Sequence, residues 1–206
     1  MIRTHTFSAA GGHPANEDAF VLRPHAGVWL VALADGQGGR AGGAWAAQLA
    51  CRVAIERASE GASPAWTEAL THADSAVAAD AQAGFATLIG LCVHEDRVTG
   101  ASCGDSAAVV VCGDLAPRVL TSRQFKNPPV GSGDATFVPF AQELTAPWKL
   151  LAITDGVWKY AGWERVWDTL TRLSGEELLA DLQVAAQLPR TGEFPDDFTA
   201  VLLESE

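Results

Sequence analysis

The chain has 206 residues, of which 48% are hydrophobic and 19% charged, and this balance is typical of a folded globular protein and excludes an intrinsically disordered chain. Its formal net charge of -11 argues against a nucleic-acid partner, because nucleic-acid binding depends on Lys and Arg side chains that neutralise phosphates. The sequence has no apolar run of roughly 18 residues and no signal-peptide core, so we expect a cytoplasmic protein without membrane contact.

The first part of the chain is expected to form a hairpin followed by helices. Apolar residues fill 19–23 and 28–34, and the short turn PHAG between them predicts an antiparallel pair of strands. Apolar residues then recur at helical spacing over 44–59, which predicts a helix. A second helix, with Ser63 as its N-cap residue, is expected to extend to about residue 82.

The second part of the chain is expected to begin with strands and to end with helices and one more strand. Apolar stretches separated by short polar turns predict an antiparallel meander over 85–95, 97–103, 107–113 and 116–121. Residues 122–135 contain several Gly and Pro residues and have no period, so they predict a loop. The remaining elements are a buried strand, two helical stretches and a closing strand: 149–155, 156–170, 174–188 and 198–204.

These elements predict an α+β sandwich. Short connections between strands favour antiparallel sheets with helices packed outside, and nearly continuous apolar strands indicate burial on both faces. Periodicity leaves open whether there is one sheet or two. The four cysteines form no CxxC pair and lie in apolar segments, which favours buried thiols over a zinc site or disulfides. We expect residues 1–206 to form a single domain and the protein to be a monomer.

Carboxylates fall at the ends of the predicted strands. Glu17 and Asp18 precede the first strand of the hairpin and Asp35 follows the second, so these acids should be neighbours. By the same reasoning Asp155 follows one strand and Asp196 precedes its antiparallel partner. A further acid, Asp105, and an alternative to Asp196, Asp197, lie at other strand ends.

Several acids that meet in one place would repel one another unless a cation held them, so their convergence predicts a hard-metal site with oxygen ligands. Each Asp-Gly pair taken alone is better explained as turn chemistry. The stretch GQGGRA, residues 36–41, also fits a dinucleotide-binding fingerprint. The acid expected about 20 residues later would be Glu56, which lies within a helical pattern, so we favour the metal site.

The order NEDAF, LADGQGG, GDS, ITDG and DDFTAV resembles the metal-dependent Ser/Thr phosphatases of the protein phosphatase 2C family, from about Phe7 to Leu203. The resemblance implies a four-layer α-β-β-α sandwich of two antiparallel sheets flanked by helices. It also implies a pair of Mn²⁺ or Mg²⁺ ions at one edge, with a third, weaker metal in many members. The implied reaction is hydrolysis of phosphoserine or phosphothreonine by a metal-bridging hydroxide, without a phosphoenzyme.

The resemblance also implies roles for individual residues. Asp35 would bridge the metals, Glu17 and the carbonyl of Gly36 would serve one of them, and Asp155 with Asp196 would complete the other. The remaining matches are Asp18, which would orient a metal-bound water, Asp105, which would help to hold the third metal, and Asp197, which is the alternative to Asp196.

Some positions depart from the family pattern. His13 stands near the place where many members have a phosphate-binding arginine. It is a candidate to donate a hydrogen bond to phosphate or to act as an acid, and the alternative is an exposed loop histidine without a role. Lys126, in the loop 122–135, is in a position to reach a phosphate, but a solvated lysine is the simpler interpretation. The expected partner is a phosphorylated protein, the substrate of a cognate Ser/Thr kinase. The alternative is a non-catalytic phosphatase-like module that binds metal or a partner protein.

Overall fold

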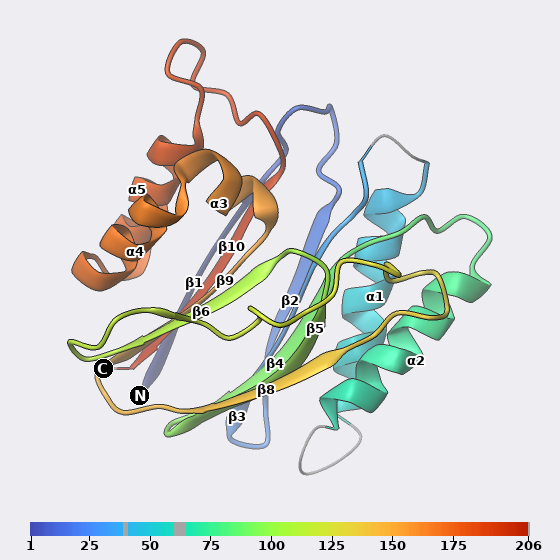
Figure 1. Cartoon of the computed structure of the whole chain (residues 1–206), viewed down its shortest axis with the longest axis horizontal. Helices are drawn as coiled ribbons and strands as arrows, with labels where there is room; N and C mark the ends of the chain where they lie inside the picture. The colour runs from blue at the N-terminus through green and yellow to red at the C-terminus, as the bar shows by residue number, and fades with distance from the viewer. Residues whose placement is uncertain (39–40, 60–64, 206) are drawn as a thin grey trace.

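Over residues 1–38, 41–59 and 65–205, which the computed structural model describes, two five-stranded antiparallel sheets lie face to face with helices on their outer faces (Figure 1). This arrangement confirms the α-β-β-α sandwich. Because both sheets are antiparallel, the dinucleotide-binding alternative is wrong: it requires a parallel βαβ unit. No helix in the described ranges is both long enough and apolar enough to span a membrane.

Each sheet draws its strands from distant parts of the chain. The first sheet has the order β1-β10-β9-β6-β7, formed by Ile2–Ala9, Phe198–Ser205, Trp148–Ile153, Ala107–Cys112 and Arg118–Val119. The second sheet has the order β2-β3-β4-β5-β8, formed by Asp18–His25, Val28–Asp35, Leu88–His94, Arg97–Cys103 and Val138–Glu143.

The helices form the outer layers. The second sheet is covered by α1 (Gly43–Ala58) and α2 (Trp66–Ala79), and the first by α3 (Asp155–Ala161), α4 (Trp163–Arg172) and α5 (Gly175–Ala186) (Figure 1). The single helix expected over 156–170 is two helices, because Gly162 between them has a φ of 83°. The expected cap Ser63 lies outside the described residues.

Apolar side chains fill three layers of core, one between the sheets and one beneath each set of helices. On β3, Val31 and Leu33 point between the sheets, whereas Ala32 and Ala34 pack against α1. Small side chains on both elements, such as Ala32 and Ala50, let α1 lie close to the sheet. The strands are therefore apolar on both faces, as a buried sheet requires.

The expected meander over 85–121 is right for the antiparallel pairs β4–β5 and β6–β7 but wrong at the step from β5 to β6. β5 pairs with β4 and β8, whereas β6 pairs with β9 and β7, so the GDS turn crosses from one sheet to the other. Gly104 makes this crossing possible, because its φ is 121° and a Cβ there would lie 2.4 Å from the Cβ of Thr87. Asp105 thus sits between the sheets' ends rather than in a hairpin.

Candidate active site

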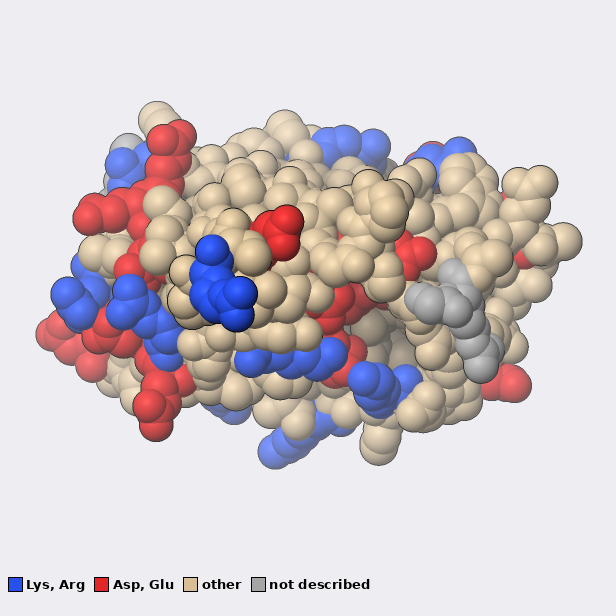
Figure 2. All heavy atoms as spheres, turned by 90° about the horizontal axis from the view of Figure 1, so that it is seen from above, with Lys and Arg blue, Asp and Glu red and all other residues tan. Residues whose placement is uncertain are grey.

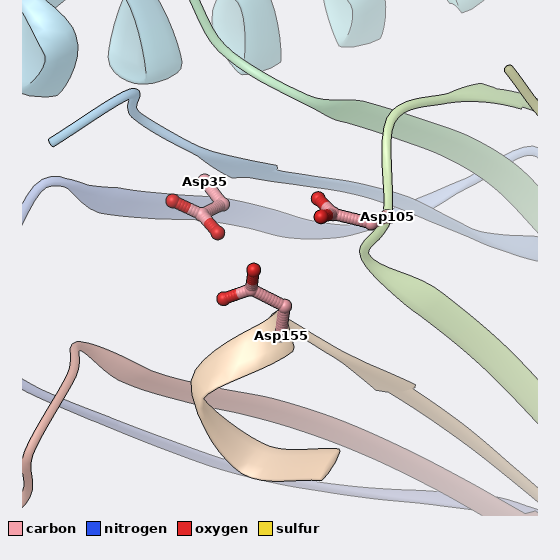
Figure 3. Close-up of side chains that lie close together, drawn as sticks. All are labelled: Asp35, Asp105 and Asp155. Carbon is pink, nitrogen blue, oxygen red and sulfur yellow. The ribbon is translucent and has the colours of Figure 1, made fainter. Parts of the chain in front are cut away.

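The site lies where strand ends of both sheets meet. Asp18 and Asp35 are direct partners in the β2–β3 hairpin, as the sequence predicts. Asp155 begins α3 directly after β9, and β9 pairs antiparallel with β10, which follows Asp196. Carboxylate oxygens of Asp35, Asp105 and Asp155 all lie within 4.8 Å of one another. Figure 3 shows these carboxylates facing one another from the end of β3, the crossing turn and the start of α3.

The acids surround a cavity of about 380 Å³. Figure 2 shows acidic side chains gathered at a hollow on this end of the molecule, with basic side chains beside it. The residues proposed from the sequence that line the cavity are His13, Glu17, Asp35, Gly36, Asp105, Asp155 and Asp196, together with the alternative Asp197. Asp18 does not line it but is buried at its edge, paired with Asp35.

Two glycines allow the backbone segments of the site to approach closely. A Cβ on Gly36 would lie 2.5 Å from the carbonyl of Gly43 and 2.7 Å from that of Glu17. A Cβ on Gly156 would lie 2.1 Å from the carbonyl oxygen of Asp197. Glycine at these positions therefore lets Asp35 approach the Glu17 segment and lets the start of α3 approach the segment before β10.

Asp196 and Asp197 have different surroundings. Asp197 accepts hydrogen bonds from the backbone N–H of Gly11, at 2.8 Å, and of Glu17, at 2.6 Å, so both of its oxygens are occupied. Asp196 accepts only a 3.1 Å bond from the N–H of Asp197 among the hydrogen bonds of the described residues. Asp197 therefore positions the segment that carries Glu17, a role that the sequence pattern does not signal, and Asp196 has the oxygens available for a cation.

The local electrostatics favour a bound cation. Burial, followed by the charges of Asp18 and Asp155, raises the pKa of Asp35 to about 9. Burial also raises the pKa of Asp18 to about 7, although a 2.8 Å hydrogen bond from the Thr154 hydroxyl opposes the shift. Burial and the charge of Asp197 raise the pKa of Glu17. These carboxylates are costly to ionise together, and a divalent cation among them would remove that cost.

The donor set fits a hard cation. One oxygen of Asp18, Oδ1, is buried and has no hydrogen-bond partner among the described residues. Carboxylate and backbone carbonyl oxygens are the ligands that Mg²⁺ and Mn²⁺ prefer. Two lysines also line the cavity and supply positive charge to it. Lys126 pairs with Asp105, and Lys159 pairs with Asp155. Lys159 is not among the site residues predicted from the sequence, although its position four residues after Asp155 on a helix is a usable signal.

Polar contacts hold the strand ends in place around the cavity. The backbone N–H of Asp35 donates to the hydroxyl of Thr87 at 3.0 Å, and that hydroxyl lies 2.8 Å from the hydroxyl of Ser106. The indole N–H of Trp158 donates to the carbonyl of Asp105 at 3.0 Å. The two sheets and α3 are thus linked through the residues that carry the acids.

The sequence matches the protein phosphatase 2C family over residues 8–190. Comparison with curated proteins gives no match. Among solved structures, the chain is similar to a bacterial serine phosphatase, with 19% identity, a TM-score of 0.82, and coverage of 100% of this chain and 98% of the other.

Further solved structures have the same fold. RsbX in complex with magnesium has 15% identity and a TM-score of 0.79, with 98% of this chain and 94% of the other covered. The serine/threonine phosphatase Stp1 from Staphylococcus aureus has 18% identity and a TM-score of 0.82, with 100% and 96% covered. At these identities the likenesses show the fold, whereas the family match spans most of the chain. The chain therefore belongs to the protein phosphatase 2C family and is a protein serine/threonine phosphatase.

Proposed function

We propose that residues 1–206 form one catalytic domain that removes phosphate from phosphoserine and phosphothreonine with a binuclear Mn²⁺ or Mg²⁺ centre. The proposed ligands are Glu17, Asp35, the carbonyl of Gly36, Asp155 and Asp196, with Asp105 available to a third, weaker metal. Bound divalent cations would lower the pKa of water and stabilise charge on the phosphoryl oxygens, which suits direct in-line hydrolysis. The observation that carries the proposal is the convergence of the oxygens of Asp35, Asp105 and Asp155.

Asp18 is suited to orient the attacking water and to accept its proton. The Thr154 hydroxyl fixes Oδ2, and Oδ1 has no partner among the described residues. With cations bound at the neighbouring carboxylates Asp18 would be ionised, and its unpartnered oxygen could then accept a hydrogen bond and a proton from a nearby water. We therefore assign Asp18 a catalytic role through water.

His13 is suited to the leaving-group side of the reaction. It lines the cavity, and a Cβ added at Gly38 would lie 3.6 Å from His13 Nε2 and 3.4 Å from Glu17 Oε2, so the imidazole is near that carboxylate. An imidazole in this position can donate a hydrogen bond to the phosphate or a proton to the departing oxygen.

One side of the cavity is bordered by a loop that α2 holds in place. The loop after β7 is held by the buried carboxylate of Asp74, which accepts hydrogen bonds from the N–H groups of Gly131, Gly133 and Ala135. The loop therefore forms a fixed wall beside an open site. We propose a monomeric, cytoplasmic enzyme that acts on the phosphoprotein product of a cognate Ser/Thr kinase.

The test is phosphate release from a phosphothreonine peptide by metal-free protein to which Mn²⁺ is added back. We expect turnover only with the metal, and a loss of at least about a hundredfold in kcat for Asp35→Asn and for Asp155→Asn. Asp134→Asn, an exposed acid outside the cavity, is the matched control and should behave like wild type. Equal rates with and without metal, or full activity of Asp35→Asn, would rule out the proposed centre.

A further inference from the structure

Two lysines from different elements line the cavity. Lys159 lies on α3 and pairs with Asp155, and Lys126 lies in the loop after β7 and pairs with Asp105. The only other lysine of the sequence, Lys149, holds backbone carbonyls at the end of α4 instead. Among the described residues that line the cavity, Lys126 and Lys159 are the only Lys or Arg side chains.

The backbone of both lysines is fixed relative to the acids. Lys159 is one helical turn after Asp155, so both side chains lie on the same face of α3. Lys126 follows Phe125, whose carbonyl accepts a 2.8 Å hydrogen bond from the N–H of Gly104, next to Asp105. Neither lysine can therefore leave the neighbourhood of the cavity, although each flexible side chain can change its partner.

Both ion pairs are open to exchange. The side chains of Lys126 and Lys159 are 65% and 41% exposed, whereas those of Asp105 and Asp155 are 21% and 9% exposed. The more exposed pair, Lys126–Asp105, contributes little to stability, so a role of Lys126 in folding alone is a weak explanation. A divalent cation bound by the carboxylates would repel both ammonium groups and leave them without an anionic partner.

The sum of charges around the cavity favours an anion as the ligand of the two lysines. Six carboxylates line it: Glu17, Asp35, Asp105, Asp155, Asp196 and Asp197. A pair of divalent cations would offset four of these charges, and the two lysines would offset the remaining two. A phosphate dianion would then meet no net negative charge, whereas without the lysines it would face two uncompensated carboxylates.

We propose that Lys126 and Lys159 form a clamp that binds the oxygens of the substrate phosphoryl group once the two cations of the proposed centre repel the ammonium groups from Asp105 and Asp155. The proposal rests on the proposed function and names the groups that recognise the phosphate there. An ammonium group offers several donors and a point charge, which suits a phosphate that arrives from solvent. The clamp supplies the positive charge that His13 provides only when it is protonated.

The test compares Lys126→Gln, Lys159→Gln and the double variant with wild type. With Mn²⁺ present, we expect each single variant to raise both KM for a phosphothreonine peptide and the inhibition constant of inorganic phosphate by about tenfold, the order expected for one charged hydrogen bond. The fall in kcat should be smaller. Lys159→Arg should retain most of the phosphate affinity. Arg172→Gln is the matched control, because it removes the same charge from an exposed ion pair outside the cavity.

Two binding measurements separate the clamp from the metal centre. Isothermal titration of Mn²⁺ into each variant should give an affinity equal to or higher than that of wild type, because the lysines no longer compete for the carboxylates. Titration of inorganic phosphate into Mn²⁺-loaded protein should show the loss of affinity without any turnover. Circular dichroism shows whether each variant is folded.

The clamp is wrong if phosphate affinity in both lysine variants stays within about twofold of Arg172→Gln. It is also wrong if Mn²⁺ affinity falls as much as phosphate affinity, because the lysines would then support the metal centre. If wild type shows no metal-dependent turnover, the proposed function fails. The phosphate titration still decides whether the lysines bind phosphate.

Discussion

Asp196 and Asp197 show how neighbouring acids of the same type can have different roles. Both line the cavity, but Asp197 uses its oxygens to hold the N–H groups of Gly11 and Glu17, and Asp196 leaves its oxygens largely unengaged. The sequence DDFTAV cannot distinguish them, because the distinction depends on hydrogen bonds to residues about 180 positions away in the chain. Only the folded structure identifies the acid that is available to a cation.

This difference predicts opposite results for two amide substitutions. Asp197→Asn replaces one accepting oxygen with a donor, so we expect the free energy of unfolding in EDTA to fall by about 1–3 kcal/mol. Asp196→Asn should leave that stability unchanged or raise it, but should weaken Mn²⁺ binding by at least about tenfold. Urea denaturation and isothermal titration measure the two quantities. The reverse pattern would show that Asp197 is the ligand.

Several residues of the candidate site could be predicted from the sequence because hairpin geometry is local. The pairing of Asp18 with Asp35 follows from the short turn between β2 and β3, and the structure has that pairing. The contribution of Lys159 was missed because a lysine on a helix is most often solvated. Its contact with Asp155 follows from their spacing on α3, whereas its position at the cavity depends on how α3 is set against the strand ends.

The sequence predicts the positions of strands and helices better than it predicts which strands pair. The hairpin, the helices on the outside and the β9–β10 pair were predicted. The edge strand β1 was not, because its apolar and polar residues alternate only weakly in IRTHTFSA and it is partly exposed. β8 was also missed. In the predicted meander only the step from β5 to β6 is wrong, because the crossing at Gly104 resembles an ordinary turn in sequence and its geometry depends on contact with Thr87.

The contact between α2 and the loop after β7 gives an element-level prediction. Asp74 is 2% exposed and accepts three backbone hydrogen bonds from the loop that carries the wall of the cavity. Asp74→Asn should lower the free energy of unfolding by about 1–3 kcal/mol, because an amide cannot accept all three bonds. Asp134→Asn, on the same loop but exposed, is the control.

Urea denaturation measures both effects on stability. Hydrogen exchange of the loop amides should become faster in Asp74→Asn while the exchange of β3 and β9 remains slow. Equal stability of Asp74→Asn and Asp134→Asn would show that the loop does not depend on this carboxylate.

In the whole molecule, two sheets built from distant segments bring strand ends to one edge (Figure 1). Acidic residues line the cavity at this edge. Folding must therefore bring like charges together before a metal is bound. The fold tolerates this because the pKa values of Asp35 and Asp18 rise to about 9 and about 7 from 3.8. In metal-free protein these groups bind protons more tightly when folded than when unfolded.

The sign of the resulting pH dependence follows from this difference. The stabilising contribution of the protonated acids is fully present below their unfolded pKa and is lost as pH rises through about 7 and then about 9. We expect the melting temperature of metal-free protein to fall as pH rises from the unfolded pKa of 3.8 to about 9. The increase in melting temperature that Mn²⁺ causes should become larger as pH rises. Thermal denaturation with EDTA or Mn²⁺ measures both.

Asp35→Asn separates the effect of this acid from the general effect of net charge, because it removes the carboxyl group whose pKa is raised to about 9. The melting temperature of this variant should fall less steeply with pH than that of wild type. A wild-type melting temperature that does not change with pH in EDTA, or a Mn²⁺ effect that is the same at every pH, would contradict the account.

Anomalous X-ray scattering from a crystal soaked in Mn²⁺ tests the central claim most directly. The account predicts anomalous peaks among the carboxylates of Asp35, Asp155 and Asp196, with Asp35 in contact with more than one ion. Peaks elsewhere on the surface, with none between Asp35 and Asp155, would contradict it.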